Sequence, residues 1–452
     1  MIYSILFIRR IKELFNLEIF LGIIKSKKEI LNMYDVNRAY SLLKRISFER
    51  TGGSKEELKA AKIIKKEIEK EGYEAKIESF PVDYSEIEEA SLQVTSPTKK
   101  KYQVTGVKMS GNTPDKGIEK DFVYVENVLD ANIVDIEDKI VLVNGRMLHT
   151  FYKKLIEKKV AGFICFSGSV YDEEENSDLD VMQIREPSYK LGKIPGVCIR
   201  ALDAQKLIDS MPKKVKIVLK QKEGKINSRN VITRIKGTKY PDQVIAITAH
   251  YDSVKFSSGA YDNASGSVGI MELFHHFVKN KPQRTMVFIW CGAEEMGLQG
   301  SKAYVKMHEE EIPNYLFCLN VDMIGVTLGR EIAVSTAEKS LVDYISYLSK
   351  EIGIPLRSSQ GVYSSDSTPF ADSGVPATSF ARISPEGGAK IHSRKDMIDF
   401  IKPHAFDSSL KMMLTFLNRL DSSIVFPIPR SIPENMKLEL DYYNLRKERP
   451  EN

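Results

Sequence analysis

The spacing of hydrophobic residues changes twice along the chain, and its first stretch predicts two helices and a strand. Apolar residues recur at helical spacing over residues 35–47 and again over residues 54–71. Ser54 followed by Glu57 is a capping-box pattern at the start of the second helix, and Gly72 marks its end. Residues 74–82 then have the pattern of a strand.

The second stretch, residues 86–224, has a different texture. Short apolar runs predict strands at 122–125, 140–143, 162–166 and 215–219, with one helix at 151–159. An acidic loop, residues 172–180, interrupts this stretch and is expected to be a solvated insertion. The pattern predicts a β-rich domain inserted into the chain.

The third stretch alternates strands with helices. Strands are predicted at 231–235, 244–249, 285–291, 316–321 and 377–380, and helices at 265–278, 299–308, 341–352 and 404–420. Such alternation favours an α/β fold, a three-layer sandwich around a mostly parallel central sheet. We assign residues 34–85 and 225–425 to this domain. Residues 426–452 contain four prolines and mixed charge, which indicates a surface extension.

The first 33 residues are expected to be an extension outside both domains. Residues 1–24 are rich in Ile, Leu and Phe, but Arg9, Arg10 and Lys12 interrupt the run, so it is too short for a spanning helix. Two interpretations remain, an amphipathic helix in peripheral contact with a membrane or a start codon assigned too early, and we favour the second. A clear signal peptide is missing, so the expected location is the cytoplasm.

Composition narrows the function classes. Hydrophobic residues make up 42% and charged residues 28% of the chain, as in ordinary globular proteins. The net charge of +5 comes without a basic stripe, which argues against a nucleic-acid partner. No two of the four cysteines form a CxxC pair, and their apolar surroundings predict buried free thiols at Cys165, Cys198, Cys291 and Cys318.

Polar residues that could carry chemistry follow the predicted strands of the third stretch. Ligands bind beyond the carboxyl ends of strands in open α/β sheets, which selects these positions for inspection. The candidates in strand exits or the loops beyond them are His250, Asp252, Asp262, Glu294, Glu295, Asp322 and His392. The other five histidines, His149, His275, His276, His308 and His404, lie outside such loops and are interpreted as structural.

This set matches what a pair of metal ions requires. Zinc binds imidazole nitrogen and carboxylate oxygen, and two metals about 3.5–4 Å apart can share one carboxylate. Asp252 lies two residues from His250, where it can accept the second ring N–H and fix the tautomer. Each residue alone has a simpler structural explanation, because a lone histidine, a Glu-Glu pair or an Asp-Asn helix start is common. Their occurrence together in five loops favours a site for two metal ions.

The motifs that contain these residues resemble those of a known family, the co-catalytic dizinc aminopeptidases of the aminopeptidase Y-like branch. The matching stretches are AHYDS at 249–253, GAYDNASG at 259–266, CGAEEMGLQGS at 291–301, LNVDMIG at 319–325, SDSTPFADSGVPA at 365–377 and IHSRKD at 391–396. The inserted stretch is similar to that branch's protease-associated domain, with EDKIVLVNGR at 137–146, KKVAGFICFSG at 158–168 and IPGVCIRALDAQKL at 194–207.

The resemblance implies a role for each candidate and a zinc-exopeptidase (phosphorylase/hydrolase-like) fold. His250 and Asp322 would hold one zinc, Glu295 and His392 the other, with Asp262 bridging both. Asp252 would orient His250, and Glu294 would be the general base toward a zinc-bridged hydroxide. The implied activity is removal of amino-terminal residues from short peptides. Cobalt or manganese suits the same ligands as zinc.

Three rival hypotheses remain. A carboxypeptidase or dipeptidase of the glutamate carboxypeptidase-like branch would need a cation for the substrate carboxylate, and Arg382 is the candidate, although a structural role is the simpler expectation. A non-catalytic binding relative should have lost ligands, and none is missing here. A relative of the glutaminyl cyclases would use a single zinc. The sequence carries no signal for oligomeric state.

Overall fold

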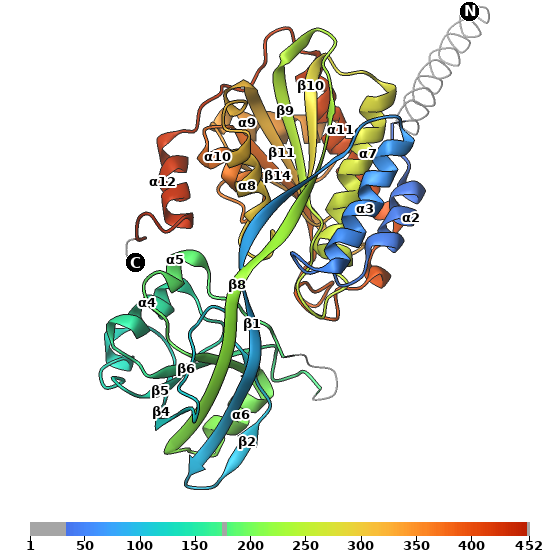
Figure 1. The fold of residues 1–452 in the computed structure, drawn as a ribbon. Coiled ribbons are helices and arrows are strands. Elements are labelled where there is room, and N and C mark those ends of the chain that lie inside the picture. The colour runs from blue at the N-terminus through green and yellow to red at the C-terminus, as the bar shows by residue number, and fades with distance from the viewer. Residues whose placement is uncertain (1–32, 174–178, 450–452) are drawn as a thin grey trace, which may run out of the picture.

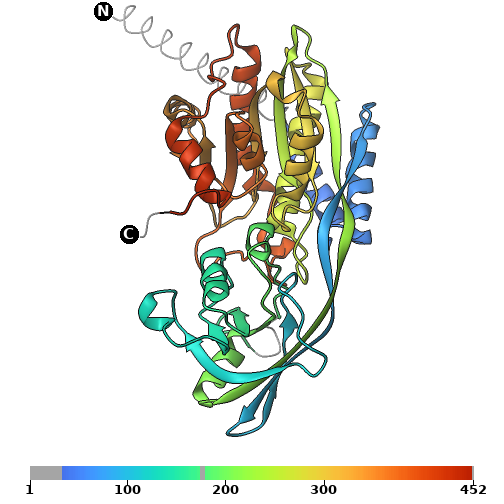
Figure 2. The ribbon, with the colours of Figure 1, turned by 60° about the vertical axis from the view of Figure 1, so that its left-hand side comes forward.

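Two lobes joined by a pair of very long strands make up the molecule in a computed structural model that describes residues 33–173 and 179–449 (Figures 1 and 2). The large lobe comprises residues 33–85 and 225–449, and the small lobe residues 86–224. Strands β1 (Lys76–Ser96) and β8 (Lys214–Ile235) pair antiparallel from Lys76↔Ile232 to Ser96↔Lys214 and belong to both lobes. The N-terminal segment for which a peripheral helix was considered lies outside the described residues.

The sheet of the large lobe is mixed, with parallel strands at its centre. Its order is β13 (Leu356–Gln360), β12 (Arg330–Thr336), β14 (Ala377–Ile383), β11 (Tyr315–Val321), β9 (Tyr240–His250), β10 (Arg284–Cys291), β8 and β1. Strands β14, β11, β9 and β10 run parallel to one another, whereas β12 pairs antiparallel with β14, and β8 with β10. The carboxyl ends of the four central strands therefore meet at one edge.

Helices cover both faces of this sheet and complete three layers (Figure 1). One face carries α2 (Val36–Ile46), α3 (Lys55–Lys70), α7 (Ser265–Lys279), α9 (Lys339–Glu351) and α11 (Asp407–Ser422). The other carries α8 (Gln299–Met307), α10 (Ser367–Asp372) and α12 (Glu434–Tyr443). The first face packs around aromatic residues such as Phe274, Phe317 and Phe416. The predicted α/β sandwich is confirmed.

Local chemistry explains where the first helices begin. The Asp35 carboxylate accepts the N–H groups of residues 37 and 38, and the Ser54 hydroxyl accepts the N–H of Glu57 at 2.9 Å. The Glu57 side chain reaches the N–H of Gly53 at 3.0 Å instead of that of Ser54, and it pairs with Arg229 at 2.9 Å. Half of the expected capping box therefore forms, because β8 offers Glu57 a stronger partner.

The small lobe contains a parallel sheet of its own, which the sequence patterns only partly predicted. Strands β4 (Ile118–Val125), β5 (Ile140–Val143), β6 (Gly162–Ser167) and β7 (Gly196–Arg200) pair in parallel. Short β3 (Thr105–Gly106) pairs antiparallel with β7, and short β2 (Lys100–Tyr102) pairs antiparallel with β1. Besides α4 (His149–Glu157), which was expected, α5 (Glu186–Tyr189) and α6 (Ala201–Asp209) are present. Its likeness to a protease-associated domain stays a prediction.

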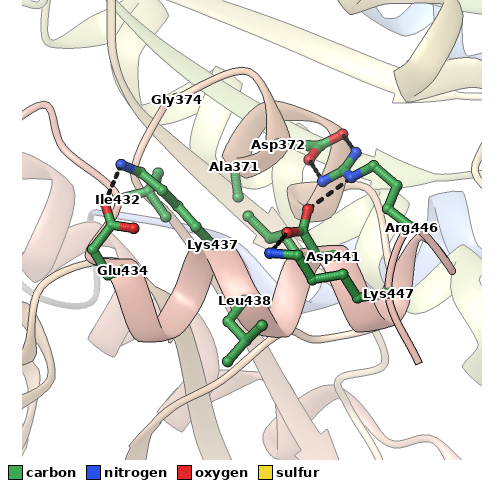
Figure 3. Close-up of a pocket in the computed structure, with 11 residues that line it drawn as sticks. Ala371, Asp372, Gly374, Ile432, Glu434, Lys437, Leu438, Asp441, Arg446 and Lys447 are labelled. Atoms are coloured by element: carbon green, nitrogen blue, oxygen red, sulfur yellow. Dashed lines mark hydrogen bonds and ion pairs between the residues drawn. The ribbon is translucent and has the colours of Figure 1, made fainter. Parts of the chain in front are cut away.

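The C-terminal segment is more ordered than a surface extension. Helix α12 buries Met436 and Leu440 against the α8–α10 face of the large lobe. A groove of about 610 Å³ lies between α12 and α10, and Arg446 pairs there with Asp372 at 2.6 Å and Asp441 at 2.8 Å (Figure 3). No helix within the described ranges is long and apolar enough to cross a lipid bilayer.

Candidate metal centre

The polar edge of the large-lobe sheet brings together residues from five separate loops. His250 is the last residue of β9, Asp322 follows β11 directly, and Glu294 and Glu295 lie just beyond β10. Asp262 precedes α7, and His392 lies in the loop after β14. The strand-exit rule therefore placed these candidates at one edge, as the parallel order requires.

Two clusters of potential metal ligands form there and share one carboxylate. In the first, His250 Nε2 lies 3.2 Å from Asp262 Oδ1 and 3.5 Å from Asp322 Oδ1. In the second, His392 Nε2 lies 3.1 Å from Asp262 Oδ2 and 3.1 Å from Glu295 Oε2. Asp262 thus presents one oxygen to each cluster, which is the arrangement that a bridging carboxylate needs.

The side chain of Asn263 fixes the backbone around Asp262. Its amide donates to the Val321 carbonyl at 2.9 Å, and its oxygen accepts the N–H groups of Gly266 and Met323, each at 2.9 Å. The residue before Asp322 and the residue after it are thereby tied to the loop that carries Asp262. The separation of the two carboxylates is set by hydrogen bonds from the Asn263 side chain to the backbone on both sides of Asp322.

Asp252 is fully buried and connects His250 with the Glu294–Glu295 loop. Its carboxylate accepts the N–H of Glu294 at 3.0 Å and that of Glu295 at 3.3 Å. Asp252 Oδ1 also lies 3.5 Å from His250 Nδ1, on the side of the ring that faces away from the two clusters. The contact leaves Nε2 of His250 directed at Asp262 and Asp322.

Burial and crowded charge shift the pKa values of these groups strongly. Burial would lower the pKa of His250, but the carboxylates of Glu294, Asp252, Asp262 and Asp322 raise it well above its ordinary value. Burial likewise opposes protonation of His392, yet Asp262 and Glu295 raise its pKa to about 11. The site concentrates negative charge and therefore favours any cation within it.

The donor set fits divalent cations. Glu295 Oε1 and Asp322 Oδ1 are buried and lack a hydrogen-bond partner among the described residues. Buried polar atoms normally have partners, so atoms of this kind beside two ligand clusters indicate coordination chemistry. Imidazole with carboxylate is a ligand set that zinc accepts.

Glu294 belongs to neither cluster although it follows β10 with Glu295. Its side chain is 9% exposed, and burial raises its pKa well above the ordinary value, with added repulsion from Glu295 and Asp366. A carboxylate whose pKa is raised in this way is a stronger proton acceptor than an ordinary carboxylate. Glu294 is therefore placed for acid–base chemistry next to the clusters.

Arg382 and three of the remaining histidines have structural partners. Arg382 donates to the carbonyl oxygens of Val326 at 2.7 Å and Thr327 at 3.1 Å and pairs with Glu331 at 3.1 Å. These contacts account for the Arg382 side chain without a bound substrate. The hypothesis that Arg382 binds a substrate carboxylate therefore loses its support. The histidine contacts are those of His149 with Ser188, His276 with Asn418, and His308 with Glu78. All four cysteines are buried and free.

The structure also reveals supporting residues that the sequence did not single out. Arg50 is fully buried and donates to the carbonyl oxygens of Tyr251, Ser258 (2.5 Å) and Gly259 (2.8 Å), which bracket the loop after His250. Asp366 accepts the Ser301 hydroxyl at 2.5 Å. Asp366 lies in the SDSTPF stretch, which could have drawn attention, whereas nothing in the sequence around Arg50 signals its role.

The small lobe touches the large lobe close to these clusters. Asp172 Oδ1 lies 3.5 Å from Lys395 Nζ, three residues after His392. Arg185 at the start of α5 lies beside Gly297, two residues after Glu295. The small lobe therefore borders the edge of the sheet at which the candidate residues meet.

Known proteins that are similar to this chain are peptidases. Residues 230–417 match the model of peptidase family M28. Aminopeptidase YwaD of Bacillus subtilis (strain 168) is 28% identical to this chain, and the alignment covers 78% of this chain and 77% of YwaD. Carboxypeptidase Q of Homo sapiens is 26% identical, and the alignment covers 73% of this chain and 73% of carboxypeptidase Q. Of the solved structures, BSAP, a zinc aminopeptidase from Bacillus subtilis, superposes with a TM-score of 0.72 at 22% identity over 88% of this chain and 99% of its own.

The two relatives and BSAP each cover most of this chain, and the family match over residues 230–417 includes every candidate residue. The structural likeness to BSAP establishes the fold, and the family match covers the segment that contains both clusters. Residues 230–417 are therefore similar to peptidase family M28, and the chain is a zinc-dependent metallopeptidase.

Proposed function

We propose that this protein is an aminopeptidase that removes amino-terminal residues from short peptides and binds two zinc ions. His250 and Asp322 hold the first ion, Glu295 and His392 the second, and Asp262 bridges them. The observation that carries the proposal is the division of the Asp262 oxygens, with Oδ1 3.2 Å from His250 and Oδ2 3.1 Å from His392. One carboxylate shared by two ligand clusters is typical of two-metal hydrolases.

The remaining roles follow from burial and contacts. Bound zinc supplies Lewis acidity, which eases the ionisation of water and polarises the scissile carbonyl group. Glu294 accepts the proton that the attacking water loses and donates it to the leaving amine. Asp252 holds the His250 ring in the orientation that turns Nε2 toward Asp262 and Asp322.

The charge of the site favours recognition of a free amino terminus. Five carboxylates, those of Asp252, Asp262, Glu294, Glu295 and Asp322, face only two imidazoles. After two divalent cations are bound, carboxylate oxygen remains to accept hydrogen bonds from a substrate ammonium group. Arg382, the residue considered for a substrate carboxylate, is occupied by Glu331 and two carbonyl groups. An amino terminus therefore fits this edge better than a carboxyl terminus.

Access to the site is expected to be limited by the small lobe. The contact of Asp172 with Lys395 and the position of Arg185 beside Gly297 bring this lobe next to the loops of both His392 and Glu295. A wall on that side would admit a short peptide more easily than a folded chain. We therefore expect the small lobe to act as a scaffold and to narrow the entrance.

One assay series tests the proposal. The zinc-loaded protein should hydrolyse aminoacyl-4-nitroanilides, treatment with a chelator should abolish this activity, and added Zn²⁺ should restore it. Peptides blocked at the amino terminus should resist cleavage, whereas peptides blocked at the carboxyl terminus should be cleaved. The opposite preference would support the carboxypeptidase alternative, to which the likeness to carboxypeptidase Q points. Elemental analysis that finds a single zinc per chain would contradict the two-ion centre.

A further inference from the structure

Asp396 is a buried carboxylate that touches the loop of Asp262 without belonging to either ligand cluster. Its side chain is 1% exposed. Oδ1 accepts the N–H of Tyr261 at 2.7 Å, and Oδ2 accepts the N–H of Asp262 at 3.0 Å. Both oxygens are thus used to hold two consecutive peptide groups, the second of which belongs to the bridging residue itself.

The same residue is connected to the loop of His392. Asp396 follows His392 by four positions, and the Ser258 hydroxyl donates to its carbonyl oxygen at 2.5 Å. Arg50 anchors the preceding part of the 251–262 loop through the carbonyl groups of Ser258 and Gly259. The amides of residues 261 and 262, in contrast, are held by Asp396.

The two clusters differ in how firmly their own backbone holds them. His250 ends a strand paired on both sides, and the N–H of Asp322 donates to the Phe380 carbonyl at 3.0 Å. His392 lies in a loop without strand pairing, has a φ of 55°, and its side chain is 35% exposed compared with 1% for His250. A histidine in the left-handed region needs support from its surroundings.

We propose that Asp396 is a positioning residue for the second zinc, because it fixes the loop of Asp262 against the loop of His392. The proposal rests on the two-zinc function above. The separation of 3.1 Å between Asp262 Oδ2 and His392 Nε2 depends on this link, whereas the first cluster is held by β9, β11 and Asn263. Loss of the link weakens the second site and leaves the first nearly unchanged.

Asp396→Asn is the variant that removes the link with least change in shape. The amide has one acceptor oxygen, so its NH2 group must face one of the two backbone N–H donors. One hydrogen bond is lost and two donors are brought together. Outer residues that orient metal ligands commonly affect metal affinity by about 10- to 100-fold, and that is the loss expected at the second site.

The chain supplies a matched control in Asp421. Its carboxylate also accepts two consecutive N–H groups, those of Gln283 and Arg284, each at 2.8 Å. Asp421 is 7% exposed and lies on α11. It contacts the start of β10, the end of that strand opposite to Glu294. Asp421→Asn therefore imposes the same chemical change on the fold without touching a ligand loop.

The test is a calorimetric titration of metal-free wild type, Asp396→Asn and Asp421→Asn with Zn²⁺, together with elemental analysis and melting temperature. Wild type should bind two ions in resolvable steps. In Asp396→Asn the weaker step should lose about 10- to 100-fold in affinity while the tighter step changes by less than about threefold. In Asp421→Asn both steps should stay at the wild-type affinity even if the melting temperature falls.

The results distinguish a failure of the role proposed for Asp396 from a failure of the two-zinc function. Unchanged zinc affinity in Asp396→Asn, or an equal loss in Asp421→Asn, overturns the role of Asp396 while leaving the two-zinc function intact. A wild type that binds a single ion contradicts the two-zinc function first, and the role of Asp396 with it. If Asp396→Asn does not fold, Ser258→Ala is measured instead, because it removes only the hydrogen bond to the Asp396 carbonyl. The proposal then requires Ser258→Ala to bind the second Zn²⁺ more weakly than wild type does.

Discussion

Both lobes contain parallel strands whose carboxyl ends meet at one edge, yet only one of these edges is equipped for chemistry. In the large lobe the central strands lead into His250, Glu294 and Asp322. In the small lobe, strands β5 and β6 lead into Asn144 and Gly168. The topology is shared, and the residues at the strand exits differ.

The difference shows what a parallel sheet supplies and what it does not. Pairing in parallel brings loops from distant parts of the chain together at no extra cost in either lobe. Burying several carboxylates at such an edge costs free energy that a metal ion must offset. Within residues 33–173 and 179–449, the groups of side chains suited to a metal all belong to the large lobe. The small lobe instead buries hydrophobic residues on both faces of its sheet.

The largest expected effect comes from Glu294→Gln, which removes the proposed base from the large-lobe edge. Because Glu294 belongs to neither ligand cluster, the variant should keep its zinc. Loss of a general base lowers kcat by about 10²- to 10⁴-fold. The measurement is kcat on an aminoacyl-4-nitroanilide with zinc content determined on the same sample. An unchanged kcat would remove Glu294 from the mechanism.

A pair of glycine substitutions compares the two lobes directly. An Ala side chain at Gly266 would collide with Asn263 Oδ1 and the Val321 carbonyl, and one at Gly196 in the small lobe would collide with the ring of Phe163. Overpacking of this kind costs about 1–3 kcal/mol in each lobe. Only Gly266→Ala displaces Asn263, which ties the loops of Asp262 and Asp322 together.

Gly266→Ala should therefore lose zinc as well as stability, whereas Gly196→Ala should lose stability alone. Urea unfolding of the metal-free variants measures the first quantity, and Zn²⁺ titration measures the second. Wild-type zinc affinity in Gly266→Ala would mean that Asn263 does not set the geometry of the ligands. A loss of zinc in Gly196→Ala would mean that the small lobe supports the centre through its core.

The sequence predicted the large lobe well, because its strands and helices are long and regularly patterned. The α/β sandwich was predicted correctly, and the strand-exit rule selected the residues that the structure brings together, from His250 to His392. Strands β12 and β13 were missed, since Arg330–Thr336 and Leu356–Gln360 carry several polar residues where a buried strand would be apolar. The pairing of β12 with β14, and of β13 with β12, decides their structure.

The supporting contacts of the site could not be predicted in the same way. Arg50 binds carbonyl groups 201 to 209 positions away in the chain, and Asp396 binds N–H groups 134 and 135 positions away. A hydrogen bond to a backbone carbonyl or N–H places no requirement on the residue type of the partner. A metal ligand requires a particular side-chain chemistry, so the residue type alone identifies candidates. A positioning residue requires a particular place in the folded protein, which the sequence does not show.

A buried charge away from the site tests whether the large lobe tolerates ionised groups only at its metal edge. Glu272 on α7 is 1% exposed and pairs with Arg38 through two hydrogen bonds of 2.8 and 2.6 Å. Burial opposes ionisation of Glu272, but Arg38 and neighbouring donors hold its pKa below the ordinary value. Glu272→Gln should cost about 1–3 kcal/mol at neutral pH and leave zinc affinity unchanged.

The pH dependence of this contribution has a defined sign. Since the pKa of Glu272 is lower in the folded than in the unfolded protein, its stabilisation is present above the unfolded value and is lost as the pH falls through the folded value. Metal-free wild type should therefore lose more stability than Glu272→Gln between neutral and acidic pH. Parallel pH profiles of the two proteins in urea unfolding would contradict the assignment.

The smallest effect is expected for His149→Ala, which removes the single histidine of the small lobe. His149 begins α4 and hydrogen-bonds through Nδ1 to the Ser188 hydroxyl at 2.7 Å, a contact that joins α4 to α5. Its loss should cost about 0.5–1.5 kcal/mol of stability, with zinc content and kcat/KM at the wild-type level. His250→Ala is the counterpart at the large-lobe edge and should lose zinc outright. If His149→Ala lost zinc as His250→Ala does, the small lobe would contribute to the metal centre through the contacts that join the lobes. The conclusion that only the strand ends of the large lobe bind metal would then be wrong.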